Sequence, residues 1–267
     1  MKAMIFAAGL GTRLKPLTDN MPKALVPVGG IPLLEHVGKK LLSSGIDEAV
    51  INVHHFAGQI EEWCALQDWM SVFPHVKHPG KLAVRFSDER EMLLETGGAV
   101  LHARPLLEGC GSFLVHNVDI LSNLDICWLE ARVRPDAMAT LLVSDRKTSR
   151  YLLFEPDTMR LAGWTNLNTG EIRSPYSGLD PQKCVRKAFS GIHIMSDKIF
   201  GVLEDYARSE GLYHLSDTPK FSIIDFYLSV CATSGIYGVP ADSLQLIDVG
   251  KSDILSTLSH PPRFPSF

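Results

Sequence analysis

The segment from Ala7 to Lys23 carries residue types that bind phosphate groups. Gly9 and Gly11 allow main-chain N–H groups to approach an anion without side chains in the way. Arg13 can hold phosphate oxygens through two parallel hydrogen bonds, and Lys23 adds a mobile positive charge. The apolar run before the glycines is long enough for one buried strand. The segment therefore favours a strand that ends in a loop wrapping the phosphates of a nucleotide.

Three other interpretations of this segment compete. Lys2 followed by apolar and small residues resembles a short signal-peptide core, but the run continues directly into Arg13 and Lys15 without a clear cleavage region. The G-x-G-x-x-G dinucleotide fingerprint requires a glycine where this chain has Leu14. A plain tight turn after a strand stays open on these residues alone, so the rest of the chain has to decide.

Two acidic residues occupy similar positions in different halves of the chain. Asp119 follows the apolar run 113–115 and a polar pair, and Asp248 follows the run 244–247. Magnesium prefers hard oxygen ligands and usually takes one or two protein carboxylates, with phosphates and water completing its shell. Either residue alone is equally consistent with a loop cap. Together with a phosphate-binding loop, they favour magnesium-assisted phosphoryl chemistry.

Two further segments contain glycines where a ligand would approach the backbone. Glu95, Thr96, Gly97 and Gly98 stand at the start of a predicted helix, whose N-terminal amides favour an anion or a carbonyl oxygen. An ordinary helix cap through Thr96 is the alternative. Gly191 interrupts a predicted strand, which indicates either a bulge or a ligand close to the backbone.

Strand-like and helix-like segments alternate through the first half of the chain. This pattern predicts an α/β fold with a mainly parallel sheet and helices on both faces, whose ligands bind outside the carboxyl ends of the strands. The predicted strands are 3–8, 49–53, 82–86, 112–116 and 138–144, and the predicted helices are 31–44, 57–66, 97–104 and 124–133.

The second half is less regular and is expected to form a smaller lobe packed on the sheet. We treat the chain as one domain, with a nucleotide-binding half over 1–145 and a half over 146–267 that binds sugar and completes the metal site. The predicted elements here are a hairpin of 151–154 and 161–165, an exposed loop over 166–183, strands 188–195, 236–239 and 244–247, helices 197–208 and 222–233, and a short helix after Gly250.

Composition excludes several classes of partner. The chain has 267 residues and a formal net charge of −4, which gives no electrostatic reason to expect nucleic acid or an anionic membrane. No apolar run approaches the roughly 20 residues that span a bilayer. The five cysteines are scattered without C-x-x-C spacing, which favours a reducing, cytoplasmic setting over a disulfide framework. Composition does not indicate whether the protein is a monomer or a homo-oligomer.

Taken together, these motifs resemble the sugar-1-phosphate nucleotidyltransferase family over essentially the whole chain. The first and most specific is A-A-G-L-G-T-R-L-K-P-L-T at 7–18, followed by P-K-A-L-V-P-V at 22–28. The others, in the family's order, are L-E-T-G-G at 94–98, Asp119, F-S-G-I at 189–192 and D-V-G at 248–250. The E-T-G-G run and the compact length are most similar to N-acetylmuramate-1-phosphate uridylyltransferases and their mannose-1-phosphate guanylyltransferase relatives.

The resemblance implies a fold, a reaction and its substrates. The fold is the nucleotide-diphospho-sugar transferase fold, a Rossmann-like three-layer sandwich with a mostly parallel central sheet and a smaller packed sugar-binding lobe. The reaction converts a nucleoside triphosphate and a sugar 1-phosphate to a nucleotide sugar and pyrophosphate, with magnesium as cofactor. UTP with N-acetylmuramate 1-phosphate and GTP with mannose 1-phosphate are the pairs that the resemblance favours.

The resemblance also implies roles for individual residues. Catalysis would rest on Arg13, which holds the leaving pyrophosphate, and on Lys23, which stabilises charge on the α-phosphate. The residues implied in nucleotide binding are Ala8, Gly9, Gly11, Thr12, Arg13, Lys23, Thr96 and Gly97. Those implied in sugar binding are Glu95, Asn117 and Gly191, and those implied in holding magnesium are Asp119 and Asp248.

The sequence departs from the family pattern at two points. The family usually has N-G-D where this chain has Asn117, Val118 and Asp119, so Val118 either tightens the turn or alters the sugar pocket. The sugar-phosphate lysine found as E-K-P in many relatives has no clear equivalent, since the nearest candidate, Glu155-Pro156, lacks it.

Two other functions share the first motif. A phosphocholine cytidylyltransferase would need an aromatic cage for a quaternary ammonium, and Trp128, Trp164, Tyr176 and Tyr213 are the available aromatic residues. A catalytically silent relative would bind a nucleotide sugar and regulate a partner. Retention of both basic and both acidic residues of the implied active site argues against the silent relative.

Overall fold

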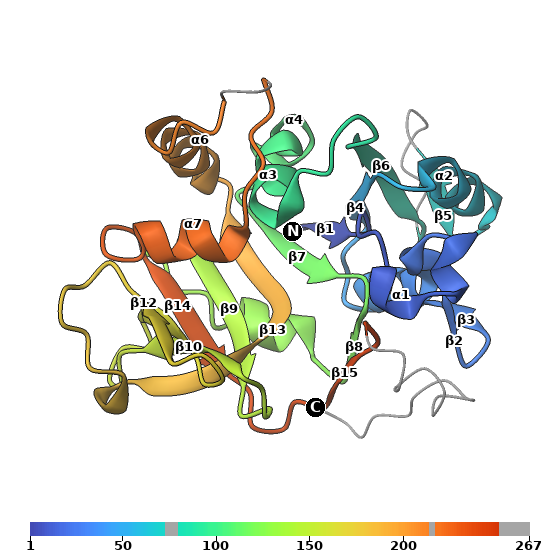
Figure 1. Ribbon diagram of the computed structural model, residues 1–267. Helices are drawn as coiled ribbons and strands as arrows, with labels where there is room; N and C mark the ends of the chain where they lie inside the picture. The colour runs from blue at the N-terminus through green and yellow to red at the C-terminus, as the bar shows by residue number, and fades with distance from the viewer. Residues whose placement is uncertain (73–79, 214–216, 251–267) are drawn as a thin grey trace.

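A computed structural model describes residues 1–72, 80–213 and 217–250 (Figure 1). An 11-stranded mixed sheet runs through this part of the chain, in the order β12-β11-β10-β13-β7-β1-β4-β6-β5, with β9 and β14 joined to it through β13. The strands around β1 pair in parallel, whereas β13 runs antiparallel to β7, β9 and β10. The predicted α/β fold with a mostly parallel core is confirmed.

The first half contains the predicted alternation of strands and helices. Its strands are β1 (Lys2–Phe6), β2 (Pro27–Val28), β3 (Ile31–Pro32), β4 (Glu48–Val53), β5 (Met70–Val72), β6 (Leu82–Asp88), β7 (Ser112–Asn117), β8 (Ile120–Ser122) and β9 (Ala139–Ser144). Its helices are α1 (Leu33–Ser43), α2 (Ala57–Leu66), α3 (Glu95–His102), α4 (Arg104–Leu107) and α5 (Ile126–Glu130), with 3₁₀ turns at Thr12–Leu14, Leu17–Asp19 and Lys23–Leu25.

The second half extends the same sheet. Its elements are β10 (Arg150–Phe154), β11 (Leu161–Asn166), β12 (Glu171–Arg173), a 3₁₀ turn at Pro181–Lys183, β13 (Val185–Ser196), α6 (Ile199–Ser209), α7 (Ile223–Val230), β14 (Ile236–Pro240) and β15 (Leu246–Asp248). The prediction of a continuous loop over 166–183 is wrong, because β12 pairs with β11 at the edge of the sheet. β12 has only three residues, all of them exposed, which is too short a segment for a strand period to be recognised in the sequence. The helix predicted after Gly250 lies outside the described residues.

Helices cover both faces of the sheet and make three layers. Ala3 and Ile5 of β1 point into a cluster with α1, α2 and α5, whereas Met4 points into a second cluster with α3, α4, α6 and α7. This alternation follows from the two-residue side-chain period of a strand. Both faces of β1 are therefore buried, and its carboxyl end is fixed in the middle of the sheet. No helix in the described ranges is long and apolar enough to cross a membrane.

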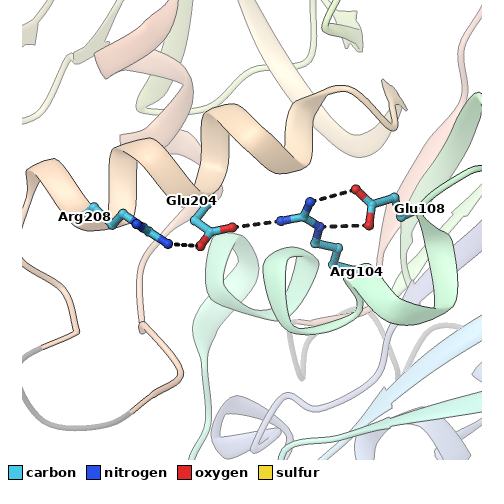
Figure 2. Close-up of polar contacts among 4 residues, drawn as sticks. All are labelled: Arg104, Glu108, Glu204 and Arg208. Atoms are coloured by element: carbon cyan, nitrogen blue, oxygen red, sulfur yellow. Dashed lines mark hydrogen bonds and ion pairs between the residues drawn. The ribbon is translucent and has the colours of Figure 1, made fainter.

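Ion pairs at the surface join α4 and α6, two of the helices that cover the Met4 face of the sheet. Arg104 of α4 bonds to Glu108 in its own turn and reaches across to Glu204 of α6 at 2.8 Å (Figure 2). Glu204 also accepts from Arg208, one turn further along α6. These four exposed or half-exposed charged side chains link α4 to α6. Helix α6 in turn contacts α7 and α3, and α3 begins with the E-T-G-G residues.

Candidate functional site

The glycine-rich loop follows β1, and most of its residues from Gly9 to Arg13 are exposed. Gly11 adopts the left-handed conformation with a φ of 65°, and its carbonyl accepts hydrogen bonds from Leu14 N–H and the Thr18 hydroxyl, both at 2.8 Å. A methyl group on Gly11 would lie 2.8 Å from Cγ2 of Thr18, so glycine is required for conformation and for space. The amides of residues 9–13 find no acceptor within the described part of the chain. Successive unpaired amides form a ready site for an anion.

A buried polar relay positions this loop from behind. Oδ1 of Asn52, on β4, accepts from Ala7 N–H at 2.7 Å and from Ala8 N–H at 3.3 Å. The Asn52 amide donates to Glu89 at 2.7 Å, and the other oxygen of Glu89 accepts from Leu94 N–H at 3.1 Å. Burial raises the pKa of the Glu89 carboxyl. The relay thus connects the start of the phosphate loop to the residue that precedes α3.

The two predicted metal-binding acids lie together although they are far apart in sequence. Asp119 sits in the turn after β7, next to β8, and Asp248 ends β15, which pairs antiparallel with β8. A methyl group on Gly250 would lie 2.9 Å from Oδ2 of Asp119, 2.9 Å from Oδ1 of Asp248 and 3.1 Å from Nη2 of Arg13. Gly250 therefore marks a small space into which two carboxylates and the arginine of the phosphate loop converge.

Lys23 completes this group of charges. It begins the 3₁₀ turn Lys23–Leu25, and its ammonium group forms an ion pair with Asp119. The side chains are only 12% and 14% exposed, so the pair is largely shielded from water. Lys23 and Asp119 are therefore held together by their own ion pair, and the implied contacts of both with nucleotide and metal stay predictions.

The start of α3 differs from the prediction that its amides are open to a ligand. The N–H groups of Gly97 and Gly98 both donate to the carbonyl of Phe221, at 2.8 and 3.2 Å, and the hydroxyl of Thr96 accepts from Ile223 N–H. The prediction that the glycine amides at this helix start are open to a ligand is therefore wrong. A methyl on Gly97 would lie 2.4 Å from the Phe221 ring, so close packing explains this glycine. Contacts of Thr96 and Gly97 with nucleotide stay predictions.

Glu95 has an unusual backbone conformation. Its φ of 61° lies in the left-handed region, which costs a residue with a side chain about 1 kcal/mol or more. The side chain is exposed at the N-terminus of α3, beside the Leu94 amide that the relay holds. Strain of this kind is concentrated at functional positions. The backbone strain at Glu95 supports the implied contact of this residue with a ligand, which stays a prediction.

Gly191 lies at a bulge beside Asn117. The pairing of β13 with β9 shifts register between Phe189 and His193, which confirms the bulge alternative for this glycine. Gly191 has a φ of 79°, and a methyl there would lie 2.7 Å from Nδ2 of Asn117. The structure thus brings together two of the implied sugar-binding residues. Val118 is buried in the core, which favours a role in the turn over a change in the sugar pocket.

A cavity of about 490 Å³ opens beside the acidic pair and the glycine-rich loop. Arg13 and Asp248 line one part of it, and the second half of the chain supplies the rest. The second-half side chains with charges are Arg146, Arg150, Arg173 and Asp225, and the main apolar ones are Leu152, Trp164 and Phe189. Of the four aromatic residues considered for a choline cage, Trp164 alone is among the described residues that line this cavity.

The sequence interpretation missed the relay and the arginines of the cavity. Asn52 is a polar residue inside an otherwise apolar strand, which is a signal that could have singled it out. Glu89 and the arginines have no such signal, because acidic and basic residues in loops and at strand ends are usually solvated. Their importance appears only when the fold brings them to the carboxyl ends of β6 and β9.

The fold and these residues define an α/β protein in which a glycine-rich loop and an acidic pair lie together at the carboxyl ends of the central strands. The chain belongs to the Nucleotidyl transferase family, which matches residues 2–155. It is 31% identical over 247 residues to an N-acetylmuramate α-1-phosphate uridylyltransferase of Caulobacter vibrioides, covering 91% of this chain and 89% of that protein. A protein of the same description from Neisseria meningitidis is 41% identical over 125 residues, covering 47% of this chain and 49% of that protein.

A solved structure shares the fold over the full length. The crystal structure of a putative glucose-1-phosphate thymidylyltransferase from Bacillus anthracis superposes with a TM-score of 0.72 at 18% identity, covering 100% of this chain and 98% of that one. The described part of the chain therefore has the fold of the nucleotide-diphospho-sugar transferases, including the described residues after 155, which the family match does not reach.

Proposed function

We propose that this protein transfers a nucleotidyl group from a nucleoside triphosphate to a sugar 1-phosphate. A phosphate oxygen of the sugar attacks the α-phosphorus in line, the bond from that phosphorus to the bridging oxygen breaks, and pyrophosphate leaves. No covalent enzyme intermediate is needed. The observation that carries the proposal is the convergence of Arg13, Asp119 and Asp248 on the space beside Gly250, with Lys23 paired to Asp119 and with a nearby loop whose amides have no acceptor in the described residues.

In this proposal the loop and its cations bind the triphosphate. The amides of residues 9–13 and the guanidinium of Arg13 hold the β- and γ-phosphates, where charge develops on the leaving pyrophosphate. Lys23 offers its ammonium to the α-phosphate from the position that Asp119 gives it. These groups are fixed by the fold before substrate arrives, so little reorganisation is needed as charge develops.

The acidic pair fits a magnesium ion. Two carboxylates converge on a space that a single Cβ on Gly250 would fill, and both offer the hard oxygen ligands that magnesium prefers. No cluster of three candidate metal-binding side chains occurs in the described ranges, which agrees with an ion that takes most of its ligands from phosphates and water. We therefore propose Asp119 and Asp248 as its protein ligands. When bound, the ion would neutralise phosphate charge.

UTP and N-acetylmuramate 1-phosphate are the proposed substrates. The two relatives described as acting on this sugar phosphate cover 91% of the chain in one case and 47% in the other. Phosphocholine is disfavoured, because a quaternary ammonium would enter a cavity whose wall carries Arg146 and Arg150. We place the reaction in the cytoplasm, and all five cysteines are free thiols, as in a reducing compartment.

A pyrophosphate-release screen tests the proposal. Five nucleoside triphosphates, namely UTP, GTP, CTP, ATP and dTTP, are each combined with N-acetylmuramate 1-phosphate, mannose 1-phosphate, glucose 1-phosphate and phosphocholine. We expect release with a sugar 1-phosphate and the fastest rate with UTP and N-acetylmuramate 1-phosphate. If no pair gives pyrophosphate release, the result would contradict the proposed enzymatic activity and favour a catalytically silent protein that binds a nucleotide sugar.

Single substitutions test the roles of individual residues. Lys23→Ala, Asp119→Ala and Asp248→Ala should each abolish most pyrophosphate release while circular dichroism shows an intact fold. Near-normal turnover in a folded Asp119→Ala variant would contradict the metal assignment.

A further inference from the structure

Two arginines of the cavity have no role in the steps above. Arg146 lies in the connection between β9 and β10, and Arg150 is the first residue of β10. Both line the cavity that Arg13 and Asp248 also reach. The nucleotide loop already has its own cations in Arg13 and Lys23. The charge of the two additional arginines therefore needs a separate explanation.

Neither arginine is satisfied by the protein. Arg146 makes one weak contact, from Nη2 to the carbonyl of Phe189 at 3.4 Å, and its Nε is buried with no partner in the described part of the chain. The guanidinium of Arg150 has no hydrogen bond or ion pair to a described residue. A buried donor without a partner costs free energy, so Arg146 fits a site where a ligand supplies the acceptor. Arg150 is exposed, and its guanidinium is available to the same ligand.

Arg173, which lines the same cavity, differs from these two arginines because the protein supplies it with partners. Its Nη1 forms an ion pair with Asp225 at 2.8 Å, and its guanidinium lies 5.9 Å from the ring centroid of Trp164. The protein thus neutralises Arg173 with a carboxylate from α7. It provides no such carboxylate for Arg146 or Arg150 among the residues that line the cavity.

The remaining walls suit a sugar. Trp164, Phe189 and Leu152 offer apolar surface from three neighbouring strands, against which the C–H face of a pyranose can pack. A cavity with an apolar wall and two unpaired guanidinium groups matches a molecule that has a ring and an anionic group. Because the cavity also reaches Asp248 and Arg13, the anionic group of such a molecule can approach the α-phosphate.

We propose that Arg146 and Arg150 bind the phosphate of the acceptor sugar 1-phosphate. This inference rests on the proposed nucleotidyl transfer, and it gives this chain a replacement for the missing E-K-P lysine. Guanidinium groups donate paired hydrogen bonds to phosphate oxygens and so fix orientation as well as charge. Positive charge on the acceptor side also offsets the repulsion between the attacking phosphate and the triphosphate.

The test compares the kinetics of the two substrates. Arg146→Ala and Arg150→Ala should each raise the KM for the sugar 1-phosphate by about 10- to 100-fold, with the KM for the nucleoside triphosphate changed by less than about 2-fold. Arg150→Lys should recover part of the loss. Arg186→Ala is the matched control, since Arg186 is exposed on β13 and does not line the cavity. Unchanged thermal unfolding would separate lost binding from a damaged fold.

Other outcomes overturn the inference in distinguishable ways. An active wild-type enzyme whose arginine variants keep the wild-type KM for sugar 1-phosphate overturns the inference and leaves the proposed reaction standing. A rise in the KM for the triphosphate with an unchanged KM for sugar 1-phosphate assigns the arginines to the triphosphate and overturns the inference. Calorimetry with N-acetylmuramate 1-phosphate and a saturating non-hydrolysable UTP analogue gives a readout without turnover. If the wild type and the variants bind equally well in that measurement, the inference fails whether or not pyrophosphate is released.

Discussion

The backbone N–H of Val249 donates to the carbonyl of Asp119 at 2.9 Å. This bond joins the turn after β15 to the turn after β7, and antiparallel pairing of Asp248 with Ile120 continues from it. The carboxylates of Asp119 and Asp248 are therefore held by backbone hydrogen bonds at a common point beside Arg13, at Gly250. Backbone pairing of this kind fixes the two acids in position before any ligand binds.

Gly250→Ala should remove activity with little loss of stability. The added methyl group would lie 2.9 Å from each carboxylate, in the space where we place the metal ion and phosphate. We expect pyrophosphate release to fall by about 100-fold or more, the loss typical of a damaged charge-stabilising site. Gly201→Ala on α6 is the control, because a methyl there meets nothing within 4 Å. Normal turnover in Gly250→Ala would contradict the proposed site.

Asn52→Ala should weaken both the fold and nucleotide binding. The substitution removes the acceptor of Ala7 and Ala8 and leaves Glu89 buried without its donor. We expect the free energy of unfolding to fall by about 1–3 kcal/mol and the KM for the triphosphate to rise. Denaturant unfolding and initial-rate kinetics measure the two effects. Asp88→Asn, at an exposed neighbour of Glu89, should change neither, and an unaffected KM in Asn52→Ala would argue against a positioning role for the relay.

Gly97→Ala distinguishes packing from ligand contact at the start of α3. The new methyl would lie 2.4 Å from the ring of Phe221, so we expect a loss of about 1–3 kcal/mol in the free energy of unfolding. Replacing the ring by a smaller side chain, in a Gly97→Ala/Phe221→Leu double variant, should recover part of the lost stability. Gly58→Ala, in the open on α2, is the control. A fully stable Gly97→Ala variant that has lost nucleotide affinity would favour direct ligand contact.

Stability should fall as pH falls, through a buried histidine. Burial lowers the pKa of His193 from an ordinary 6.5 to about 3, and Nδ1 of the ring lies 3.1 Å from the hydroxyl of Tyr227. The unfolded chain therefore takes up a proton near pH 6.5, whereas the folded chain does not until about pH 3. Stability from this group is complete above pH 6.5 and is lost progressively below it.

Urea unfolding measures this effect. Between about pH 7.5 and about pH 5, His193 should contribute a loss of about 2 kcal/mol in the free energy of unfolding. A His193→Phe/Tyr227→Phe variant keeps the volume and removes the titrating group, so its loss over the same range should be smaller by that amount. An identical pH dependence in the variant and the wild type would show that His193 is not the group responsible.

Local sequence was enough to predict much of the fold and the phosphate loop. Strand β1 is a continuous apolar run, and helix α1 has apolar residues at helical spacing. Gly11 and Arg13 indicate phosphate binding within a few residues of each other. Asp119 and Asp248 could be singled out because each follows an apolar run. These features depend on hydrophobic period and backbone conformation, which are properties of neighbouring residues.

Only the tertiary structure decided which of these residues meet and what surrounds them. The pairing of β15 with β8 brings Asp248 to Asp119, and the docking of Phe221 on Gly97 and Gly98 closes the amides that looked open. Arg146 and Arg150 gain meaning only through the cavity that they share with Arg13. Contacts between residues so distant in the chain are set by the packing of whole elements, and no local pattern of residues encodes them.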